Sequence, residues 1–390
     1  MKNRIFTRTI ILVSLISFFN DISSEMLYPI MPVYLKSIGF SVVLIGILEG
    51  IAEAVAGFSK GYFGQLSDNK GKRLPFVQLG YALSAISKPM LAFLVNPVWI
   101  FIARTTDRLG KGVRTSARDA ILSDESSKEN KGKVFGFHRA FDTLGATVGP
   151  VLALLYLHHY PEQYKWLFIF AFIPGVVSVL ISLLVKEKNK IVQYNTKTHF
   201  FSFISYWKKS DIRFKYLVIG LLAFAFFNSS DVFLLLMLKY NGLSDTQMLG
   251  MYIFYNTVFA IASLPVGYLG DKIGLFNLLI IGLLLFVAVY FSFGFNQSII
   301  VFVLLFFVYG IYASATDCIS KALITNIAKS EHTATALGFF NGFSSIATLL
   351  ASSVGGLLFY LNPKLMFFFS GTGVLIVIVY LLYIKSKKLL

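Results

Sequence analysis

The stretch GQLSDNKGKR, residues 64–73, is the most informative part of the chain. It follows a long apolar segment and places two glycines, one aspartate and three bases in a short polar hairpin. The stretch GYLGDKIG, residues 267–274, follows another apolar segment and repeats the Gly, Leu, Asp and Gly of the first in the same order. A polar hairpin that recurs in this way indicates that the chain consists of two similar halves.

Three further matches fall in the same order in both halves. Phe18-Phe19-Asn20 matches Phe226-Phe227-Asn228, Thr106-Asp107 with Lys111 matches Thr316-Asp317 with Lys321, and Gly136-Phe137 followed by Phe141 matches Gly338-Phe339 followed by Phe343. Four matches in register favour an internal duplication over chance. Transporters are often built from such repeats, with the substrate site between the two halves near the middle of the membrane.

The composition is that of a membrane protein. Of the 390 residues, 56% are hydrophobic and only 14% are charged, and the formal net charge is +16. A soluble domain carries about 25% charged residues, so an ordinary soluble enzyme is excluded. The 40 Phe and 20 Tyr exclude a disordered basic protein. We therefore expect the excess Lys and Arg in cytoplasmic loops rather than on a surface that binds nucleic acid.

Twelve segments are long and apolar enough to cross a bilayer as helices, some of them with internal charges. Their approximate ranges are 9–35, 41–66, 74–96, 97–120, 134–157, 164–186, 212–239, 245–268, 274–295, 297–325, 333–361 and 365–384. A polar, lysine-rich stretch separates six segments from six. We predict an all-α membrane protein with an N-terminal six-helix bundle (1–187), a cytoplasmic linker (188–210) and a C-terminal six-helix bundle (211–390).

The basic residues predict the orientation, because Lys and Arg are enriched in cytoplasmic loops. With a cytoplasmic N-terminus, the bases in the external segments are only Lys36, Lys165, Lys239 and Lys364. We therefore place both termini in the cytoplasm. The apolar stretch that follows Arg8 continues past Asp21 without a cleavage site, which predicts a retained first helix rather than a signal peptide.

The hairpin at 64–73 resembles the G-x-L-a-D-r-x-G-r-[KR] signature of the major facilitator superfamily, with Asn69 where arginine is usual. The resemblance covers nearly the whole chain and implies two pseudosymmetric six-helix bundles that rock about a central substrate site. In this family the hairpin acts as a cytoplasmic latch between the halves. The candidate gate or latch residues are Gly64, Asp68, Gly71, Arg73, Gly267 and Asp271, together with Arg114 and Arg118 near the cytoplasmic end of their segment.

A second signature of the same family is partial. The stretch RLGKG, residues 108–112, resembles its R-x-x-q-G motif, with Lys111 in place of the usual glutamine. The longer string from Asp107 to Asp142 resembles one mostly uncharacterised subgroup. Some members of that subgroup are associated with the uptake of carboxylate-type siderophores, which implies an anionic substrate.

A third signature lies in the segment predicted at 134–157. The stretch from Gly145 to Pro150 resembles a motif associated with antiporters, with Ala153 in place of its last glycine. Gly145 and Gly149 lie four residues apart and let helices pack closely, and Pro150 bends the helix. Close packing alone also explains this pattern, so antiport and simple packing both remain open.

Charged residues inside membrane helices are costly and usually face a cavity or each other. When the charges at the segment ends are left out, nine acids and nine bases lie in the predicted segments, and most of them are in the N-terminal half. In one interpretation they neutralise each other in buried networks. In the other, arginines bind an anionic substrate, because their fork matches a carboxylate or phosphate. The second interpretation makes these residues candidates for substrate binding: Asn20, Arg104, Arg108, Arg139, Asp317 and Lys321.

Proton coupling requires a carboxyl group whose protonation changes during transport. Asp21 and Glu25 lie one helical turn apart, as do Glu49 and Glu53, so each pair could share a proton. These four residues are the candidate proton-coupling residues. The alternative is that they are fixed counter-charges of the arginines in the segment at 97–120.

The sequence thus predicts a secondary, proton-coupled transporter of a small anionic solute, with a carboxylate-type siderophore as one candidate. The alternatives are a proton-coupled efflux antiporter for drugs or metabolites and, more remotely, a membrane-embedded enzyme with His138 and Asp142 as acid and base. We expect a monomer in the bacterial inner membrane whose partners are lipid, protons and a small-molecule substrate. With one cysteine, Cys318, and five histidines, no metal site is expected, nor is a cofactor or a nucleic-acid partner.

Overall fold

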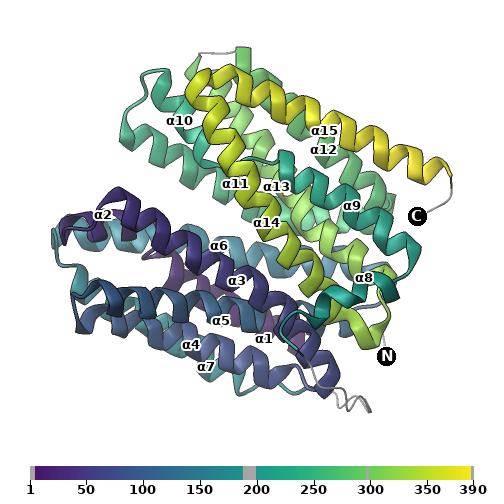
Figure 1. The fold of residues 1–390 in the computed structure, drawn as a ribbon, viewed down its shortest axis with the longest axis horizontal. Coiled ribbons are helices and arrows are strands. Elements are labelled where there is room, and N and C mark those ends of the chain that lie inside the picture. Colours follow the sequence, from purple (N-terminus) through teal and green to yellow (C-terminus); the bar gives the residue numbers. More distant parts are fainter. Residues whose placement is uncertain (1–4, 188–198, 296–297, 388–390) are drawn as a thin grey trace. The chain divides into compact units, whose positions relative to one another are not determined.

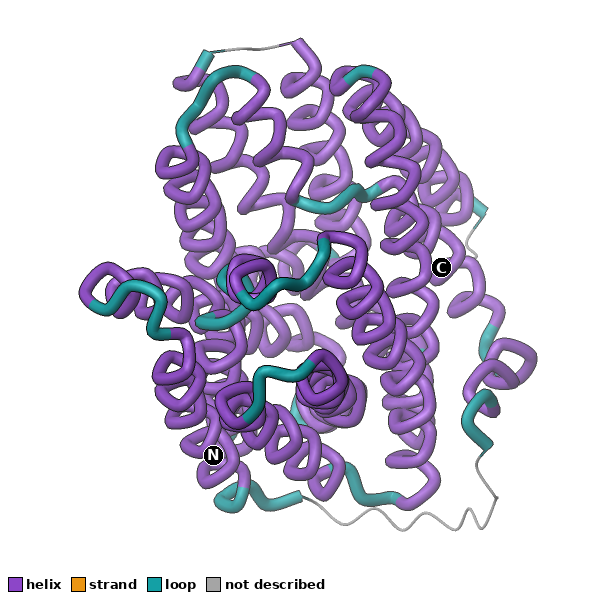
Figure 2. The backbone as a smooth tube through the Cα atoms, turned by 60° about the vertical axis from the view of Figure 1, so that its left-hand side comes forward, coloured by secondary structure: helices purple, strands orange, loops and turns teal. Residues whose placement is uncertain are grey.

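The computed structural model describes residues 5–187, 199–295 and 298–387. Within these ranges the chain forms helices joined by short loops and turns, without a strand (Figures 1 and 2). Each of the twelve predicted segments is helical, which confirms the predicted all-α class. The predicted linker lies partly outside the described residues, and its described part holds two short helical turns, η2 (Ser202–Ser205) and α8 (Tyr206–Lys209).

The first six predicted segments correspond to seven helices among the described residues. They are α1 (Arg8–Glu25), α2 (Met31–Ser37), α3 (Val42–Lys70), α4 (Leu74–Phe93), α5 (Pro97–Asp124), α6 (Lys131–His159) and α7 (Tyr164–Ser182). The last six correspond to α9 (Ile212–Phe227), α10 (Val232–Tyr240), α11 (Asp245–Ile273), α12 (Leu275–Phe295), α13 (Ile299–Ile327), α14 (Thr333–Leu361) and α15 (Pro363–Ser386). Short 3₁₀ turns, η1 (Lys128–Asn130) and η3 (Ser330–His332), precede α6 and α14.

Side-chain caps determine where several helices begin. The Ser41 hydroxyl accepts a hydrogen bond of 3.1 Å from a backbone N–H in the first turn of α3. Asn96 does the same for α5 at 2.9 Å, and Pro97 follows it as the first helical residue. Such caps satisfy N–H groups that have no partner within the helix. Helix α3 ends at Gly71, whose φ of +62° is a left-handed conformation that glycine adopts without strain.

In the part of the chain that the structure describes, eight helical stretches are long and apolar enough to cross a membrane by length and composition. They are α6, α7, the α9–α10 pair, α11, α12, α13, α14 and α15. The predicted segments that contain α1, α3, α4 and α5 carry more polar residues. Helix α5 alone holds Arg104, Asp107, Arg108, Lys111, Arg114, Arg118 and Asp119. Charged residues at membrane depth usually face the protein interior rather than lipid and often belong to a functional site. Helix α5 is therefore the leading candidate for such a site.

Two predicted segments are interrupted, so the prediction of one continuous helix in each was wrong. The segment at 9–35 leaves the helix at 26–30, between α1 and α2, where Pro29 lacks the N–H that a continuing helix needs. The segment at 212–239 breaks at 228–231, between α9 and α10. There the run Asn-Ser-Ser-Asp offers side-chain groups that compete with the backbone for hydrogen bonds.

The chain divides into two compact units. Unit 1 comprises Met1–Ser126, Phe141–Tyr206 and Ser330–Gly342, and unit 2 comprises Ser127–Ala140, Trp207–Lys329 and Phe343–Leu390. Helix α6 therefore begins in unit 2 and continues into unit 1, whereas α14 begins in unit 1 and continues into unit 2. Each unit thus includes the start of one helix from the other half of the sequence.

Apolar and aromatic side chains support the broken helices in both units. In unit 1, Leu27 is 2% exposed in the break after α1, and Tyr34 of α2 packs edge-on against Phe168 of α7 at 4.9 Å between ring centroids. In unit 2, Phe286 and Tyr290 of α12 stack at 3.8 Å. Burial of this apolar area holds the polar breaks in place.

Candidate functional site

The arginines of α5 in unit 1 pair with glutamates of α3. Arg104 makes a bidentate contact with Glu49, in which its Nη2 lies 2.6 Å from Oε1 and 2.8 Å from Oε2. Arg108 Nη2 lies 3.1 Å from Glu53 Oε1 and 3.8 Å from Glu49 Oε2. Two predicted substrate-binding residues and two predicted proton-coupling residues therefore form a single charged cluster.

The glutamates are the more open side of this cluster. Their side chains are 28% exposed in Glu49 and 53% in Glu53, against 7% in Arg104 and 9% in Arg108. The Nε atom of Arg108 is buried and has no hydrogen-bond partner among the described residues. One turn further along α5, Lys111 is exposed and forms no ion pair with a described side chain. In this cluster the two arginine side chains are therefore buried, and the two glutamate side chains are the more exposed part.

A buried ion pair lies beside this cluster. The Lys88 ammonium of α4 donates to Asp107 Oδ1 at 2.6 Å, and it also donates to Ser24 Oγ at 3.2 Å. Lys88 and Asp107 are both buried. The sequence analysis did not single out Lys88, because nothing in the linear chain says which base of α4 meets which acid of α5.

Arg114 and Arg118, both predicted to serve the latch, lie in a buried network of unit 1. The guanidinium of Arg114 lies 4.7 Å from the centroid of the Tyr81 ring. Arg118 pairs with Asp119 at 3.0 Å and with Asp142 of α6 at 3.4 Å. None of these contacts involves the hairpin after α3. The two arginines therefore join α5 to α4 and α6 within the unit.

The acids of α1 have neighbours on other helices, and Asp21 also keeps its electrostatic interaction with Glu25. Asn20 donates to Asp21 at 3.2 Å. The Asp21 carboxyl lies within hydrogen-bonding reach of Asp142 on α6, whereas the sequence analysis paired it with Glu25. Glu25 instead lies in the electrostatic field of Lys111. The partner of Asp21 is thus a second carboxyl group on another helix.

Gly145 and Gly149 of α6 allow this meeting of carboxyl groups. A Cβ atom on Gly145 would lie 3.1 Å from Asp21 Cβ, and one on Gly149 would lie 2.8 Å from the carbonyl oxygen of Ile22. The helix continues through Pro150. Two glycines four residues apart therefore bring the backbones of α1 and α6 into contact, as small residues do between membrane helices.

Gly145→Ala is expected to lower the unfolding temperature of the purified protein by several degrees. The added methyl group must push α1 and α6 apart, and overpacking of this kind costs about 1–3 kcal/mol. Gly50→Ala on α3 is the matched control, because a Cβ there meets nothing within 4 Å. Thermal unfolding in detergent, followed by fluorescence, measures both variants. An unchanged midpoint for Gly145→Ala would contradict the close contact.

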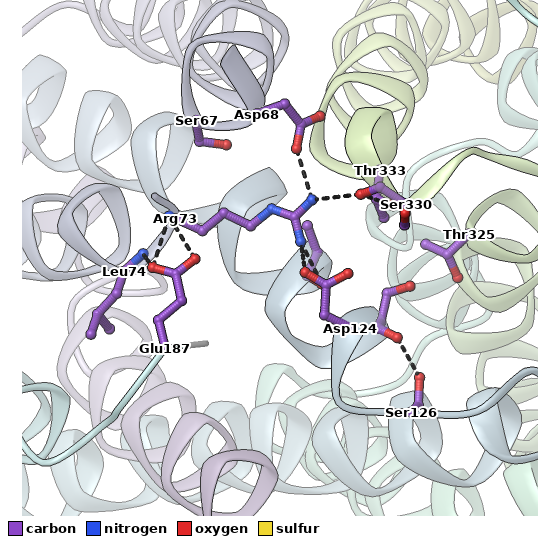
Figure 3. Close-up of polar contacts among 12 residues, drawn as sticks. Ser67, Asp68, Arg73, Leu74, Asp124, Ser126, Glu187, Thr325, Ser330 and Thr333 are labelled. Atoms are coloured by element: carbon purple, nitrogen blue, oxygen red, sulfur yellow. Dashed lines mark hydrogen bonds and ion pairs between the residues drawn. The ribbon is translucent and has the colours of Figure 1, made fainter. Parts of the chain in front are cut away.

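Asp68, at the end of α3, joins two helices within unit 1 (Figure 3). Its Oδ1 accepts from Arg73 Nη2 at 2.8 Å, and its Oδ2 accepts from the backbone N and the hydroxyl of Thr335 at 2.7 and 2.8 Å. Arg73 also pairs with Asp124 at the end of α5 and donates to the carbonyl oxygen of Ser330 at 3.2 Å. The carboxylate thus lies at the N-terminus of α14, where the helix dipole favours negative charge.

The neighbours of Asp68 complete this contact. A Cβ atom on Gly64 would lie 2.5 Å from the carbonyl oxygen of Ala334, so α3 and α14 approach as closely as their backbones allow. Glu187 accepts from the backbone N of Arg73 and of Leu74, each at 2.8 Å, and caps the start of α4 (Figure 3). The hairpin after α3 is therefore bonded to α14 through Asp68 and to Glu187 through the backbone of Arg73 and Leu74.

The second hairpin makes the equivalent contact within unit 2. Asp271 accepts from the backbone N of Gly132 at 2.8 Å and from that of Lys133 at 2.9 Å, in the first turn of α6. A Cβ atom on Gly267 would collide with the carbonyl oxygen of Gly132. The sequence repeat is thus also a repeat of geometry, in which an aspartate caps a helix from the other half of the sequence.

In unit 2 the start of α6 brings a base to an acid of α13. Arg139 Nε lies 3.2 Å from Asp317 Oδ2, and the guanidinium lies 4.7 Å from the centroid of the Phe259 ring. Lys321 follows Asp317 by one turn of the same helix. Arg139 and Asp317, both predicted to bind substrate, therefore meet in unit 2, whereas Arg104 and Arg108 belong to unit 1.

Asp231 is a site residue that the sequence analysis did not propose. It lies at the end of the break between α9 and α10, and its carboxylate accepts from Tyr309 at 2.6 Å and from Tyr255 at 3.2 Å. The polar run that ends at Asp231, within an otherwise apolar segment, was the signal for this site.

The described residues contain no group of three or more His, Cys, Asp and Glu side chains that could hold a metal ion. Cys318 is buried in α13, where its thiol donates to the carbonyl oxygen of Ser314 at 2.8 Å.

Comparison with known proteins agrees with this geometry. The sequence model of the Major Facilitator Superfamily matches residues 13–258 and 216–389. An uncharacterized MFS-type transporter of Methanocaldococcus jannaschii is 32% identical over 98% of this chain and 96% of its own length. A multi-drug resistance efflux pump of Streptococcus pneumoniae is 23% identical over 70% of both chains. A citrate exporter of Aspergillus niger is 26% identical over 47% of this chain and 35% of its own length.

Two solved structures share the fold. The human organic anion transporter MFSD10 superposes with a TM-score of 0.78 at 18% identity, over 96% of this chain and 99% of its own. The fucose:proton symporter of E. coli gives a TM-score of 0.75 at 13% identity, over 97% and 99%. At these identities the likeness concerns the arrangement of the helices.

Proposed function

The chain belongs to the major facilitator superfamily, and we propose that it is a proton-coupled secondary transporter of a small organic anion. The family and the structures of similar fold are membrane transporters, so the protein is a multi-pass transporter and not an enzyme. The substrate, the coupled ion and the roles of individual residues are the subject of the proposal.

The main support for an anionic substrate is the pairing of Arg104 and Arg108 with the glutamates of α3. A guanidinium fork binds a carboxylate through two parallel hydrogen bonds. Arg104 binds Glu49 in this way, donating from Nε to Oε1 at 2.9 Å and from Nη2 to Oε2 at 2.8 Å. A substrate carboxylate presents the same two oxygens. It can replace the exposed Glu53 at Arg108, whose buried Nε has no acceptor among the described residues. Lys111 supplies a further positive charge one turn away.

Two similar proteins support an anionic substrate. One is a citrate exporter, and one of the solved structures is an organic anion transporter. We propose a substrate with two or more carboxylates, a class that includes carboxylate-type siderophores. The proposed substrate-binding residues remain Asn20, Arg104 and Arg108 in unit 1, and Arg139, Asp317 and Lys321 in unit 2.

Displacement of Glu53 links anion binding to proton binding. Once a substrate carboxylate binds to Arg108, Glu53 loses its ion pair with that arginine. Without a positive partner, the protonated form of Glu53 becomes more favourable relative to the ionised form. Anion and proton then bind together. The fucose:proton symporter of the same fold supports this type of coupling.

Asp21 offers a second carrier in unit 1. Two carboxyl groups in hydrogen-bond contact can share one proton, and we propose that Asp21 and Asp142 form such a pair. Arg118, already beside Asp142, stabilises the ionised form. Glu25 and Glu49 complete the set of acids proposed for coupling.

Alternating access requires contacts at the cytoplasmic end that form and break during the cycle. We propose that the caps formed by Asp68 on α14 and by Asp271 on α6 are these contacts. Their strength comes from charge at a helix N-terminus and from glycines that permit close approach. The proposed latch residues are Gly64, Asp68, Gly71, Arg73, Gly267 and Asp271, with Arg114 and Arg118 supporting α5.

We propose the bacterial inner membrane as the location, with the protein acting as a monomer. Lysines of the cytoplasmic segments, such as Lys208 and Lys209 after η2, suit the anionic lipid of a cytoplasmic leaflet. Both proposed anion-binding clusters lie within one chain, so a second copy is not needed to complete them.

A proton-coupled efflux antiporter is the second candidate. The multi-drug resistance efflux pump of Streptococcus pneumoniae favours it, as does the contact of Gly145 and Gly149 with α1 in a helix that continues through Pro150. For this candidate, deletion of the gene is expected to make cells more sensitive to a toxic compound. Unchanged growth across a panel of such compounds argues against it.

Uptake of radiolabelled citrate into proteoliposomes tests the proposed function. We expect uptake to be faster when the external medium is more acidic than the interior. Arg108→Ala is expected to raise the KM about tenfold or more, equivalent to about 1.4 kcal/mol of binding. Asp211→Asn, at an exposed position outside the clusters, is the control. Uptake that ignores the pH gradient, or that Arg108→Ala leaves unchanged, contradicts the proposal.

A further inference from the structure

The break between α9 and α10 holds a carboxyl group with an unusual set of partners. Tyr309 donates to Oδ1 of Asp231 at 2.6 Å, and Tyr255 donates to Oδ2 at 3.2 Å. Both tyrosines are buried, at 2% and 6% exposure. The unwound turn is fastened by Ser229, whose hydroxyl lies 2.9 Å from that of Tyr290. The carboxyl is therefore held by groups from two other helices, α11 and α13, and its turn is held by a third, α12.

No basic side chain among the described residues lies within ion-pair distance of Asp231. Arg139 contributes an attractive charge, but its ion pair is with Asp317. The titratable and charged groups around Asp231 are Tyr255 of α11, Tyr290 of α12, Tyr309, Tyr312 and Asp317 of α13, and Arg139 of α6. Asp231 thus differs from the acids of unit 1, where Arg104, Arg108, Arg118 and Lys88 serve as partners.

A carboxylate at membrane depth without a positive partner is costly. A proton removes that charge. The two tyrosine hydroxyls lower the cost of the ionised form, because both donate to the carboxylate oxygens. Asp231 can therefore exist in both protonation states without unfolding its surroundings.

We propose that Asp231 is a proton-binding site in unit 2, additional to the carboxyl groups of unit 1. The inference rests on the proposed proton-coupled function and adds one proton to it, bound in unit 2. The proton comes from water and binds to Oδ2, where the bond from Tyr255 is the longer of the two. Tyr255 then turns to accept from the new hydroxyl, while Tyr309 continues to donate to Oδ1. Release reverses these steps, and no electrons are exchanged.

Infrared difference spectroscopy of the full-length protein in lipid tests the site without a substrate. A protonated carboxyl group has a carbonyl-stretch band that an ionised carboxylate lacks. The difference between wild type and Asp231→Asn, recorded across a pH series, is expected to contain one such band that disappears as the pH rises. Asp211→Asn, an exposed acid, is the control and is expected to leave this band in place. A difference spectrum without the band at any pH overturns the proposal.

Tyr309→Phe keeps the carboxyl and removes the stronger of its two donors. Because the ionised form loses a hydrogen bond, the band is expected to persist to more alkaline pH than in the wild type. This variant keeps the test valid if Asp231→Asn does not fold. A band with the wild-type pH dependence would contradict the assigned geometry.

Counting protons per citrate in proteoliposomes separates this inference from the function on which it rests. We expect Asp231→Asn to move one proton fewer per citrate than the wild type. If the wild type moves citrate without protons, the proposed function fails. If the wild type is coupled and the variant has the same ratio, only the role of Asp231 fails.

Discussion

Asp68→Asn is expected to reduce the initial rate of citrate uptake about tenfold or more and to lower the unfolding temperature. The change removes the charge from a carboxylate that binds Arg73 and caps α14 through Thr335. Hydrogen bonds to charged groups contribute about 1.5–3 kcal/mol each. A factor of ten in rate corresponds to only about 1.4 kcal/mol, so the loss of part of one such bond is sufficient.

Asp271→Asn is the matched control for the first hairpin. Its carboxylate accepts from two backbone N–H groups in unit 2, and it forms no ion pair with a described side chain, unlike Asp68 with Arg73. We therefore expect the same kind of defect in a smaller size. Equal effects of the two variants would contradict the added contribution of the Asp68–Arg73 ion pair, and wild-type uptake in Asp68→Asn would contradict the latch role.

Arg104→Ala is expected to abolish citrate uptake and to destabilise the protein by about 3 kcal/mol. The substitution leaves Glu49 without its bidentate partner, and breaking a buried ion pair costs about 3–5 kcal/mol. We expect the low end of that range, because the Glu49 side chain is 28% exposed. Thermal unfolding and the initial uptake rate measure the two effects separately.

The double variant Arg104→Gln/Glu49→Gln separates structural support from substrate binding. Two neutral amides of similar shape can hydrogen-bond to each other, so most of the lost stability is expected to return. Uptake is expected to remain absent, because no guanidinium is left at position 104 to bind a carboxylate. Recovery of both properties would show that Arg104 serves only as the partner of Glu49.

The helices and the paired hairpins could be predicted because their signals are local. Apolar runs of sufficient length, and a glycine-aspartate hairpin that occurs twice, need no knowledge of distant contacts. The same hairpins appear in the structure as caps on α14 and α6. The sequence pattern alone did not predict that each aspartate caps a helix from the opposite half of the sequence.

The partners of the membrane charges could not be predicted, because they depend on which helices face each other. The spacing on α1 paired Asp21 with Glu25, yet the glycine contact with α6 brings Asp21 to Asp142. The role of Lys88 depends on its contact with Asp107, which requires α4 and α5 to lie side by side. Asp231 was missed because the break in its helix turns a membrane charge into a carboxyl between two tyrosines.

The coupling of anion and proton movement can be read from the pH inside proteoliposomes that enclose a fluorescent pH indicator. Citrate is added outside, with the same pH on both sides at the start. Because Glu53 takes up a proton when citrate displaces it from Arg108, the account predicts that the interior becomes more acidic as citrate enters, and that Arg108→Ala abolishes this change. Citrate entry at constant internal pH, or acidification that persists in Arg108→Ala, would contradict it.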